Sequence, residues 1–309
     1  GGKLMLVYDA GAQTEAGFYP LSGPSRFSDM VGVNYVNWDN GAAATTMVGF
    51  GPVVVTKARL DALFEELAAG LRDELDYHAE AQALARYRER YLSNPALVIP
   101  EPLFELSGQH VLAMRYVGGT PLRELESADD ATRQQVAVAL ADWITEELFT
   151  YRELHADPHA GNFACDEQGR LVIYDLGAVI PVPEAHLKAM MQLLDATLAQ
   201  DPMAMDDALM KMGGRQGQGA PLALYKESAE CITPLFAPGE QDFSDVRVHR
   251  RLRELTPKVW AAMDRLQPPA DTLLLSRALN GHYWNLVRLR ARLDMHERTQ
   301  PLLAWARTP

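Results

Sequence analysis

Three oxygen-bearing side chains in the middle of the chain have the types and spacing of a site that handles phosphate. Asp157 lies five residues before Asn162, and Asp175 follows thirteen residues later within the sequence Asp-Leu-Gly. In enzymes that transfer phosphoryl groups, one aspartate orients the attacking group, while an asparagine and a second aspartate supply hard oxygen ligands to Mg²⁺. The pattern therefore predicts a Mg²⁺-nucleotide site, with Asp157 as the catalytic residue and Asn162 and Asp175 as metal ligands.

The residues around these three side chains are suited to bringing them together. Residues 166–169 favour a turn and residues 171–174 favour a short apolar strand, so we expect a hairpin that delivers Asp175 to Asn162. Upstream, apolar side chains at helical spacing predict a helix that packs beneath the loop: Val136, Leu140, Trp143, Ile144 and Leu148. Only six residues separate Gly177 from the next predicted helix. That length leaves no room for the segment with which protein kinases dock a peptide.

A long helix is predicted over residues 58–91, where apolar side chains recur at steps of three and four. Its far end carries three carboxylates, those of Glu74, Asp76 and Glu80. Asp76 and Glu80 lie four residues apart and are expected to share one face of the helix. Carboxylates on a helix usually face solvent, so this spacing alone gives them no role.

Turn signals divide the rest of the chain. Residues 1–57 favour short β segments, and residues 97–117 are strand-like. The glycine pair at 118–119 is the expected boundary between a small N-terminal lobe, residues 1–118, and a mainly helical large lobe, residues 119–309. Thr120 is expected to cap the first helix of the large lobe. The predicted fold class is α+β.

The composition restricts the classes of partner. The formal net charge of −12 at pH 7 argues against electrostatic binding to nucleic acid. The two cysteines, Cys165 and Cys231, are too few for a disulfide framework or a zinc cluster. We see no signal peptide and no apolar run long enough to span a membrane, so we expect a cytoplasmic protein. Peripheral contact with a membrane stays an alternative.

Three segments together resemble the UbiB family, also called AarF-type atypical kinases: residues 74–81, 155–162 and 174–177. Weaker likenesses lie at 117–122 and 275–283. The resemblance implies a protein-kinase-like two-lobe fold, with a β-sheet and a long helix in the small lobe and a mostly α-helical large lobe. It also implies ATP or ADP and Mg²⁺ as cofactors, and ATPase or small-molecule kinase activity in support of quinone or prenyl-lipid pathways. The partners it implies are a nucleotide, a prenyl-lipid or quinone-precursor ligand, and a peripheral membrane surface.

The resemblance gives roles to the helix carboxylates and leaves the loop residues in the roles predicted above. Glu80 would pair with a nucleotide-binding lysine. Glu74 and Asp76 would form the Glu-x-Asp signature that faces the active site. The family's Lys-x-Gly-Gln element is absent from residues 1–57, so this part of the small lobe is expected to be divergent or incomplete.

The sequence does not identify the nucleotide-binding lysine. Lys57 lies on a strand-like segment, but a helix rises 1.5 Å per residue, so a continuous helix would separate it from Glu80 by roughly 35 Å. The two could pair only if the helix breaks, for instance at Gly70. Lys3 is a weaker candidate.

Three alternatives are open. A catalytically impaired pseudokinase, acting as a nucleotide-dependent lipid- or protein-binding module, fits the missing lysine elements. A metal-dependent hydrolase could use His155, Asp157 and His159, which alternate along the loop, although a histidine before the catalytic aspartate of kinase folds usually supports the loop. The aminoglycoside-type kinases also place a His-x-Asp loop before an asparagine. The Glu-x-Asp helix and the Ala-Asp-Pro-His sequence favour UbiB.

Overall fold

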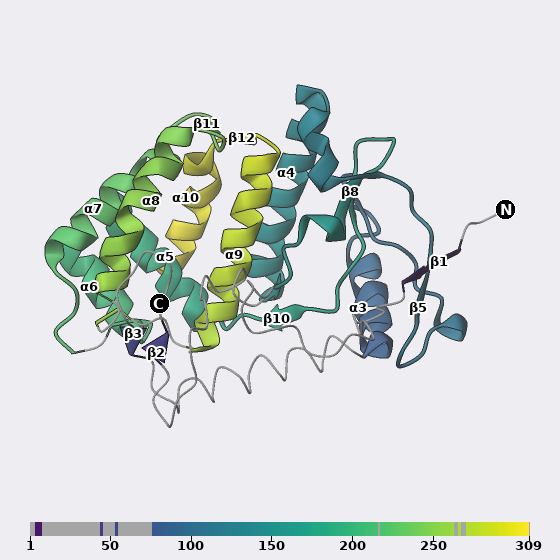
Figure 1. Cartoon of the computed structure of the whole chain (residues 1–309), viewed down its shortest axis with the longest axis horizontal. Coiled ribbons are helices and arrows are strands. Elements are labelled where there is room, and N and C mark those ends of the chain that lie inside the picture. The colour runs from purple at the N-terminus through teal and green to yellow at the C-terminus, as the bar shows by residue number, and fades with distance from the viewer. Residues whose placement is uncertain are drawn as a thin grey trace.

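The computed structural model describes residues 4–7, 44–45, 53–54, 76–215, 217–262, 265–266 and 270–308. The long helices are α3 Tyr77–Arg90, α4 Asp130–Glu146, α5 Glu184–Leu198, α6 Pro202–Lys211, α7 Leu222–Ile232, α8 Val246–Ala261, α9 Ala270–Arg288 and α10 Met295–Ala306. The strands are short: β1 Leu4–Val7, β2 Ala44–Thr45, β3 Val53–Val54, β4 Leu97–Val98, β5 Leu112–Arg115, β6 Thr120–Pro121, β7 Glu153–His155, β8 Phe163–Cys165, β9 Leu171–Ile173, β10 Val179–Pro181, β11 Gln241–Asp242 and β12 Arg292–Leu293. Figure 1 places α4 and α9 side by side at the centre, with α3, β1, β5 and β8 toward one end and the other helices toward the opposite end.

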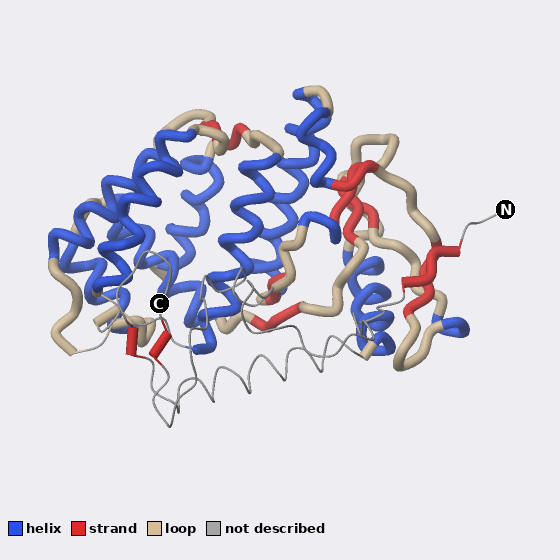
Figure 2. The backbone as a smooth tube through the Cα atoms, in the orientation of Figure 1, coloured by secondary structure: helices blue, strands red, loops and turns tan. Residues whose placement is uncertain are grey.

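The hairpin predicted after the loop is present, and it forms the middle of a four-stranded sheet. β8 and β9 pair antiparallel with Phe163 opposite Ile173, and the sheet order is β4-β9-β8-β6. The turn closes because Asp166 Oδ1 accepts hydrogen bonds from two backbone N–H groups at 2.8 and 3.0 Å, and Gly169 takes a positive φ of 80°. Figure 2 shows these strands gathered beside α3. Strands from both sides of residue 118 share this sheet, and the lobe boundary stays a prediction.

Helix α4 lies beneath the loop, as the spacing of its apolar side chains predicts. Val136, Leu140, Trp143 and Ile144 are all buried in the main core. The helix begins at Asp130 because the Asp129 side chain accepts from the backbone N–H of the first turn. It ends in a π-helical turn, η3 Glu147–Tyr151, and the chain then enters β7 and the loop.

The helix predicted over residues 58–91 is not continuous. Asp76 lies outside any helix, and its Oδ1 accepts from the backbone N–H groups of His78 at 3.1 Å and Ala79 at 3.3 Å. The aspartate thus caps helix α3, because a short carboxylate satisfies the first N–H groups of a helix better than it serves within one. Residues 57–75, which include Lys57 and Glu74, lie outside the described residues.

One further local prediction is wrong, and another is confirmed only in part. Thr120 does not cap a helix, because the backbone of β6 pairs with β8 instead, and a 3₁₀ turn, η2 Leu122–Ser127, follows. Within the strand-like residues 97–117, a second 3₁₀ turn, η1 Phe104–Leu106, separates β4 from β5. The run around η1 is short and largely apolar, and such runs do not distinguish a strand from a helical turn by sequence alone.

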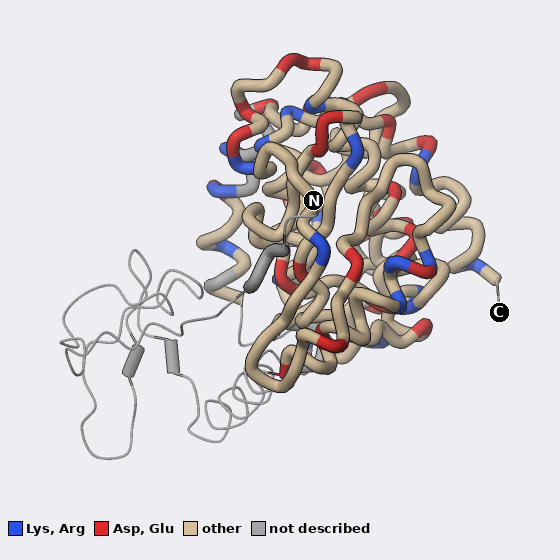
Figure 3. The backbone as a smooth tube through the Cα atoms, turned by 90° about the vertical axis from the view of Figure 1, so that its right-hand side faces the viewer, with Lys and Arg blue, Asp and Glu red and all other residues tan. Residues whose placement is uncertain are grey.

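Acidic and basic residues alternate along the described backbone, without a long stretch of one sign in this view (Figure 3). Arginines near the C-terminus form exposed ion pairs with earlier helices: Arg292 with Asp130, Arg298 with Asp142 and Arg307 with Asp195. Pairs of this kind contribute little to stability individually. Within the described residues, no helix has both the length and the apolar character that crossing a bilayer requires.

Candidate functional site

The structure brings Asp157 and Asn162 into direct contact. The loop leaves β7, passes Asp157 and returns through the 3₁₀ turn η4 Ala160–Asn162 into β8. Asn162 Nδ2 donates to Asp157 Oδ2 at 2.7 Å and to the Asp157 carbonyl at 3.3 Å. Because a carboxylate only accepts hydrogen bonds, the amide must present its nitrogen to Asp157. Its oxygen, Asn162 Oδ1, therefore faces away from that contact.

Asp175 arrives beside this pair at the end of the hairpin. The backbone N–H of Tyr174 donates to the Asn162 carbonyl at 2.9 Å, so Asp175 is the next residue along. On the other side, the Ala156 N–H donates to the Ala178 carbonyl at 2.7 Å, which ties the loop to the segment after Gly177. The two ends of the Asp-Leu-Gly turn are thus attached to the two ends of the loop. Asp157, Asn162 and Asp175 are all half-buried, at one place in the fold.

The oxygens left over suit a hard cation. Asp175 Oδ1 accepts from the Gly177 N–H at 2.8 Å, while Asp175 Oδ2 and Asn162 Oδ1 have no hydrogen bond to any other described residue. Mg²⁺ is commonly held by one or two carboxylates together with phosphate oxygens and water. No three His, Cys, Asp or Glu side chains among the described residues are grouped to hold a metal. The oxygens of Asn162 and Asp175 are of the type that Mg²⁺ prefers, and binding of Mg²⁺ with a nucleotide stays a prediction.

Glu80 also lies next to the Asp-Leu-Gly turn. Its carboxyl group is buried on α3, and a Cβ placed on Gly177 would lie 3.3 Å from Glu80 Oε2 and 3.4 Å from Asp175 Oδ1. Asp76, in contrast, is exposed and uses Oδ1 to cap α3. Glu74 and the lysine candidates Lys3 and Lys57 lie outside the described residues. The roles predicted for all of these residues stay predictions.

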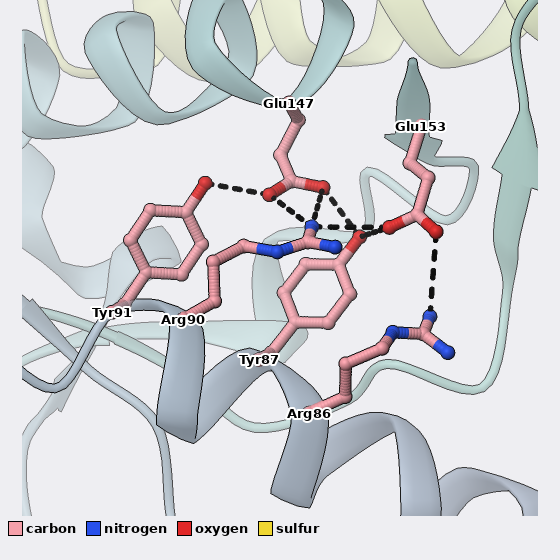
Figure 4. Close-up of polar contacts among 6 residues, drawn as sticks. All are labelled: Arg86, Tyr87, Arg90, Tyr91, Glu147 and Glu153. Carbon is pink, nitrogen blue, oxygen red and sulfur yellow. Dashed lines mark hydrogen bonds and ion pairs between the residues drawn. The ribbon is translucent and has the colours of Figure 1, made fainter. Parts of the chain in front are cut away.

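A buried charged cluster, which the sequence analysis missed, fastens α3 to the segment that leads into the loop (Figure 4). Glu147, whose side chain is 1% exposed, accepts from Arg90 Nη1 at 2.9 Å, from the Tyr91 hydroxyl at 2.6 Å and from the Tyr87 hydroxyl. Arg90 also pairs with Glu153 of β7 at 3.0 Å. Burial, followed by the nearby Glu147 carboxylate, raises the pKa of both tyrosines, so they stay protonated and donate. The far end of the helix that carries Glu80 is thereby held against η3 and β7.

His155 supports the loop from the core, as expected of a histidine in this position. It is fully buried, and its Nε2 donates to the Asp175 carbonyl at 2.7 Å. Its ring packs against those of Trp143 and Phe163, at centroid distances of 5.9 and 5.7 Å. His159 is exposed, and its Nδ1 accepts from the Gly161 N–H. The two imidazoles and Asp157 do not form the shared metal site that a hydrolase would need.

His282 of α9 packs in the same aromatic core, and its burial leads us to expect that the stability of the fold depends on pH. Burial, with a smaller contribution from His155, lowers the pKa of His282 to about 4, whereas the Asp157 carboxylate acts in the opposite direction. The unfolded chain binds this proton near pH 6.5 and the folded chain only near pH 4. The free energy of unfolding is therefore unaffected by this group above pH 6.5. It falls by about 3 kcal/mol as the pH decreases from 6.5 to 4, because the unfolded chain takes up the proton first.

Urea unfolding of the parent and of His282→Gln at pH 7 and pH 4.5 checks this expectation. The variant does not titrate at this position, so its loss of stability between the two pH values should be smaller than the parent's. His110→Gln, at an exposed position, should behave like the parent. Equal losses in all three proteins would contradict the assignment of the slope to His282.

Comparison with known proteins identifies the family. The family model described as the ABC1 atypical kinase-like domain matches residues 37–209, which is more than half of the chain and includes the whole loop and hairpin. The chain belongs to the ABC1 atypical kinase-like family. The UbiB resemblance is thereby confirmed.

Two relatives of this ABC1 family member are named as atypical kinases. It is 27% identical over 239 residues to the mitochondrial atypical kinase COQ8B of Danio rerio. This alignment covers 76% of this chain and 38% of the relative. It is 25% identical over 240 residues to the mitochondrial atypical kinase coq-8 of Caenorhabditis elegans, covering 75% and 32%. The chain therefore spans about a third of the length of these relatives.

A solved structure shows the same fold. The complex of Rv3197 with erythromycin from Mycobacterium tuberculosis superposes with a TM-score of 0.63, at 19% identity, over 85% of this chain and 66% of that chain. At this level of identity the likeness concerns the fold alone. Together with the family match, it confirms the predicted kinase-like fold of mixed α and β content, with helices predominant.

Proposed function

We propose that this chain binds ATP or ADP with Mg²⁺ and acts as an atypical kinase or ATPase of the UbiB type. The observation that supports this most strongly is the 2.7 Å contact between Asp157 and Asn162 beside the Asp-Leu-Gly turn. This contact directs Asn162 Oδ1 away from Asp157, and the bond from Gly177 leaves Asp175 Oδ2 without another described partner. Two hard oxygen ligands thus remain next to a carboxylate that can orient a nucleophile.

In the proposed mechanism Asp157 accepts a hydrogen bond from the attacking hydroxyl or water and directs it toward the terminal phosphate. Bound Mg²⁺ supplies charge neutralisation on the phosphates, with Asn162 and Asp175 as its protein ligands. Asn162 has a second task, because its amide nitrogen holds the Asp157 carboxylate in place. Phosphoryl transfer depends mainly on positioning and electrostatics, so the rate depends on how firmly this loop is held.

The family match supports a proposal for the wider role. We infer a two-lobe arrangement with the lobes at residues 1–118 and 119–309, and a prenyl lipid or quinone precursor as substrate or ligand. The role would be in the synthesis of quinones such as ubiquinone. The related COQ8 kinases are named as mitochondrial. For this chain we propose a cytoplasmic location with peripheral contact to a membrane.

Thermal unfolding with nucleotide tests the binding step. Mg-ADP should stabilise the parent, by about 2.7 kcal/mol at a concentration 100 times Kd, and ADP with excess EDTA should stabilise it much less. Asp175→Asn should lose most of the Mg²⁺-dependent part of this stabilisation. Glu167→Gln, at an exposed position on the hairpin turn, is the matched control and should keep it. Equal stabilisation of parent and Asp175→Asn by Mg-ADP would contradict the proposed metal site.

A second candidate is a pseudokinase that binds nucleotide without turning it over, because residues 1–309 contain no Lys-x-Gly-Gln element. ATP hydrolysis measured across a panel of prenyl lipids and quinone precursors separates the two. Stabilisation by Mg-ADP without turnover under any of these conditions would favour the binding module. Turnover that depends on Asp157 would favour the enzyme.

A further inference from the structure

Helix α9 touches the catalytic loop so closely that only glycine fits at the contact. A Cβ placed on Gly281 would lie 2.1 Å from Pro158 Cγ and 2.7 Å from Pro158 Cβ, distances that carbon atoms do not adopt without displacement. Glycine inside a helix is destabilising by roughly 0.5–1 kcal/mol relative to alanine. The approach of α9 to the residue that follows Asp157 gives a physical reason for a glycine here.

Two side chains of α9 also bond to the loop backbone on both sides of Asp157. His282 Nε2 donates to the carbonyl of His155 at 3.1 Å, and Asn285 Nδ2 donates to the carbonyl of Pro158 at 2.8 Å. Both side chains are buried, with exposures of 2% and 4%. Because a carbonyl only accepts, His282 must carry its proton on Nε2. Its Nδ1 then remains buried without a hydrogen-bond partner among the described residues.

The hydrogen bonds from α9 are also connected, through His155, to the Asp-Leu-Gly turn that carries Asp175. His155, whose carbonyl accepts from His282, uses its own Nε2 to bond the carbonyl of Asp175. A helix more than 120 residues downstream is therefore connected through one histidine to both the loop and the Asp-Leu-Gly turn. A helix that only filled the core would not require two buried polar side chains and a glycine on the face toward the loop.

We propose that Gly281, His282 and Asn285 are positioning residues that fix the backbone on both sides of Asp157 and so set the position of its carboxylate. The inference rests on the proposed function only in so far as Asp157 acts on the nucleophile. It assigns a task to the 275–283 segment, whose weak family likeness the loop chemistry does not explain.

Paired substitutions separate positioning from folding. His282→Leu and Asn285→Ala remove the two donors, whereas His282→Gln keeps an N–H close to the position of Nε2. Gly281→Ala pushes on Pro158. Its matched control is Gly214→Ala, where the nearest atoms to a new Cβ are at 3.5 Å and φ is not positive. Leu224→Ala, in a separate core cluster, is a control for lost stability.

Three quantities are to be measured in the full chain: kcat for ATP turnover, the Kd for Mg-ADP, and amide hydrogen exchange of the peptide covering 155–162. We expect His282→Leu, Asn285→Ala and Gly281→Ala each to lower kcat by about 10- to 100-fold with Kd changed less than about threefold. Exchange in the loop should rise. His282→Gln should recover most of the kcat that His282→Leu loses, and both controls should keep the parent's kcat and exchange.

The outcomes distinguish the two proposals. If the parent shows no turnover, the proposed enzymatic function fails, while hydrogen exchange still decides whether α9 holds the loop. Loop exchange and kcat within twofold of the parent in both donor-removing variants would overturn the positioning role. So would a loss of kcat in Leu224→Ala equal to theirs at matched stability.

Discussion

Replacing Asp157 with asparagine is expected to lower ATP turnover by about 10²- to 10⁴-fold while leaving Mg-ADP binding nearly unchanged. The asparagine oxygen can still accept the hydrogen bond from Asn162, so the loop should keep its shape. The amide carries no charge and cannot take a proton, so it cannot orient and activate the nucleophile as a carboxylate does. Single-turnover ATP hydrolysis and thermal unfolding with Mg-ADP measure the two effects separately.

Asp201→Asn is the matched control for this substitution. Asp201 caps α6 by accepting from two backbone N–H groups, at 3.0 and 3.1 Å, away from the loop. Asparagine caps a helix about as well as aspartate, so both turnover and stability should match those of the parent. Turnover by Asp157→Asn equal to the parent's would show that this carboxylate does not act in the reaction.

Glu147→Ala is expected to lower the free energy of unfolding by about 3–5 kcal/mol. The substitution removes a carboxylate that accepts from Arg90 and from two tyrosine hydroxyls in the core. Among the described residues Arg90 would keep Glu153 as its one ion-pair partner, and the Tyr91 hydroxyl would lose its acceptor. Urea unfolding followed by circular dichroism measures the change through the midpoint and the slope.

An exposed ion pair serves as the control for the loss of stability in Glu147→Ala. Glu227 forms an exposed ion pair with Lys258, so Glu227→Ala should cost less than about 1 kcal/mol. A second variant, Glu147→Gln, keeps the shape and can still accept hydrogen bonds, so it should lose less than Glu147→Ala. If Glu147→Ala and Glu227→Ala cost the same, the cluster does not hold α3 to the segment before the loop in the way described.

The local parts of the site were predictable because their signals lie close together in the sequence. Residues 166–169 contain the turn chemistry that closes the hairpin, and an apolar strand on each side fixes its register. The order of Asp157, Asn162 and the Asp-Leu-Gly turn then dictates that the three meet. Because these residues lie close together along the chain and in a fixed order, this part of the fold could be predicted from the sequence alone.

The parts that were wrong or missed depend on competition or on distant partners. Asp76 lies within the stretch whose apolar spacing predicts a single helix, but its side chain accepts from backbone N–H groups and caps the first turn of α3. Glu147 looks like one more carboxylate on a helix, and only its contacts with α3, more than 50 residues earlier, show that it is buried. His282 and Asn285 form hydrogen bonds with loop residues 127 positions earlier in the chain. The spacing of residue types along the sequence does not predict contacts at that separation.

A crystal structure with bound Mg-ADP tests the central claim most directly. We expect one Mg²⁺ at about 2.0–2.1 Å from Asn162 Oδ1 and from a carboxylate oxygen of Asp175. A nucleotide bound elsewhere, or a metal ion held by neither side chain, would contradict it.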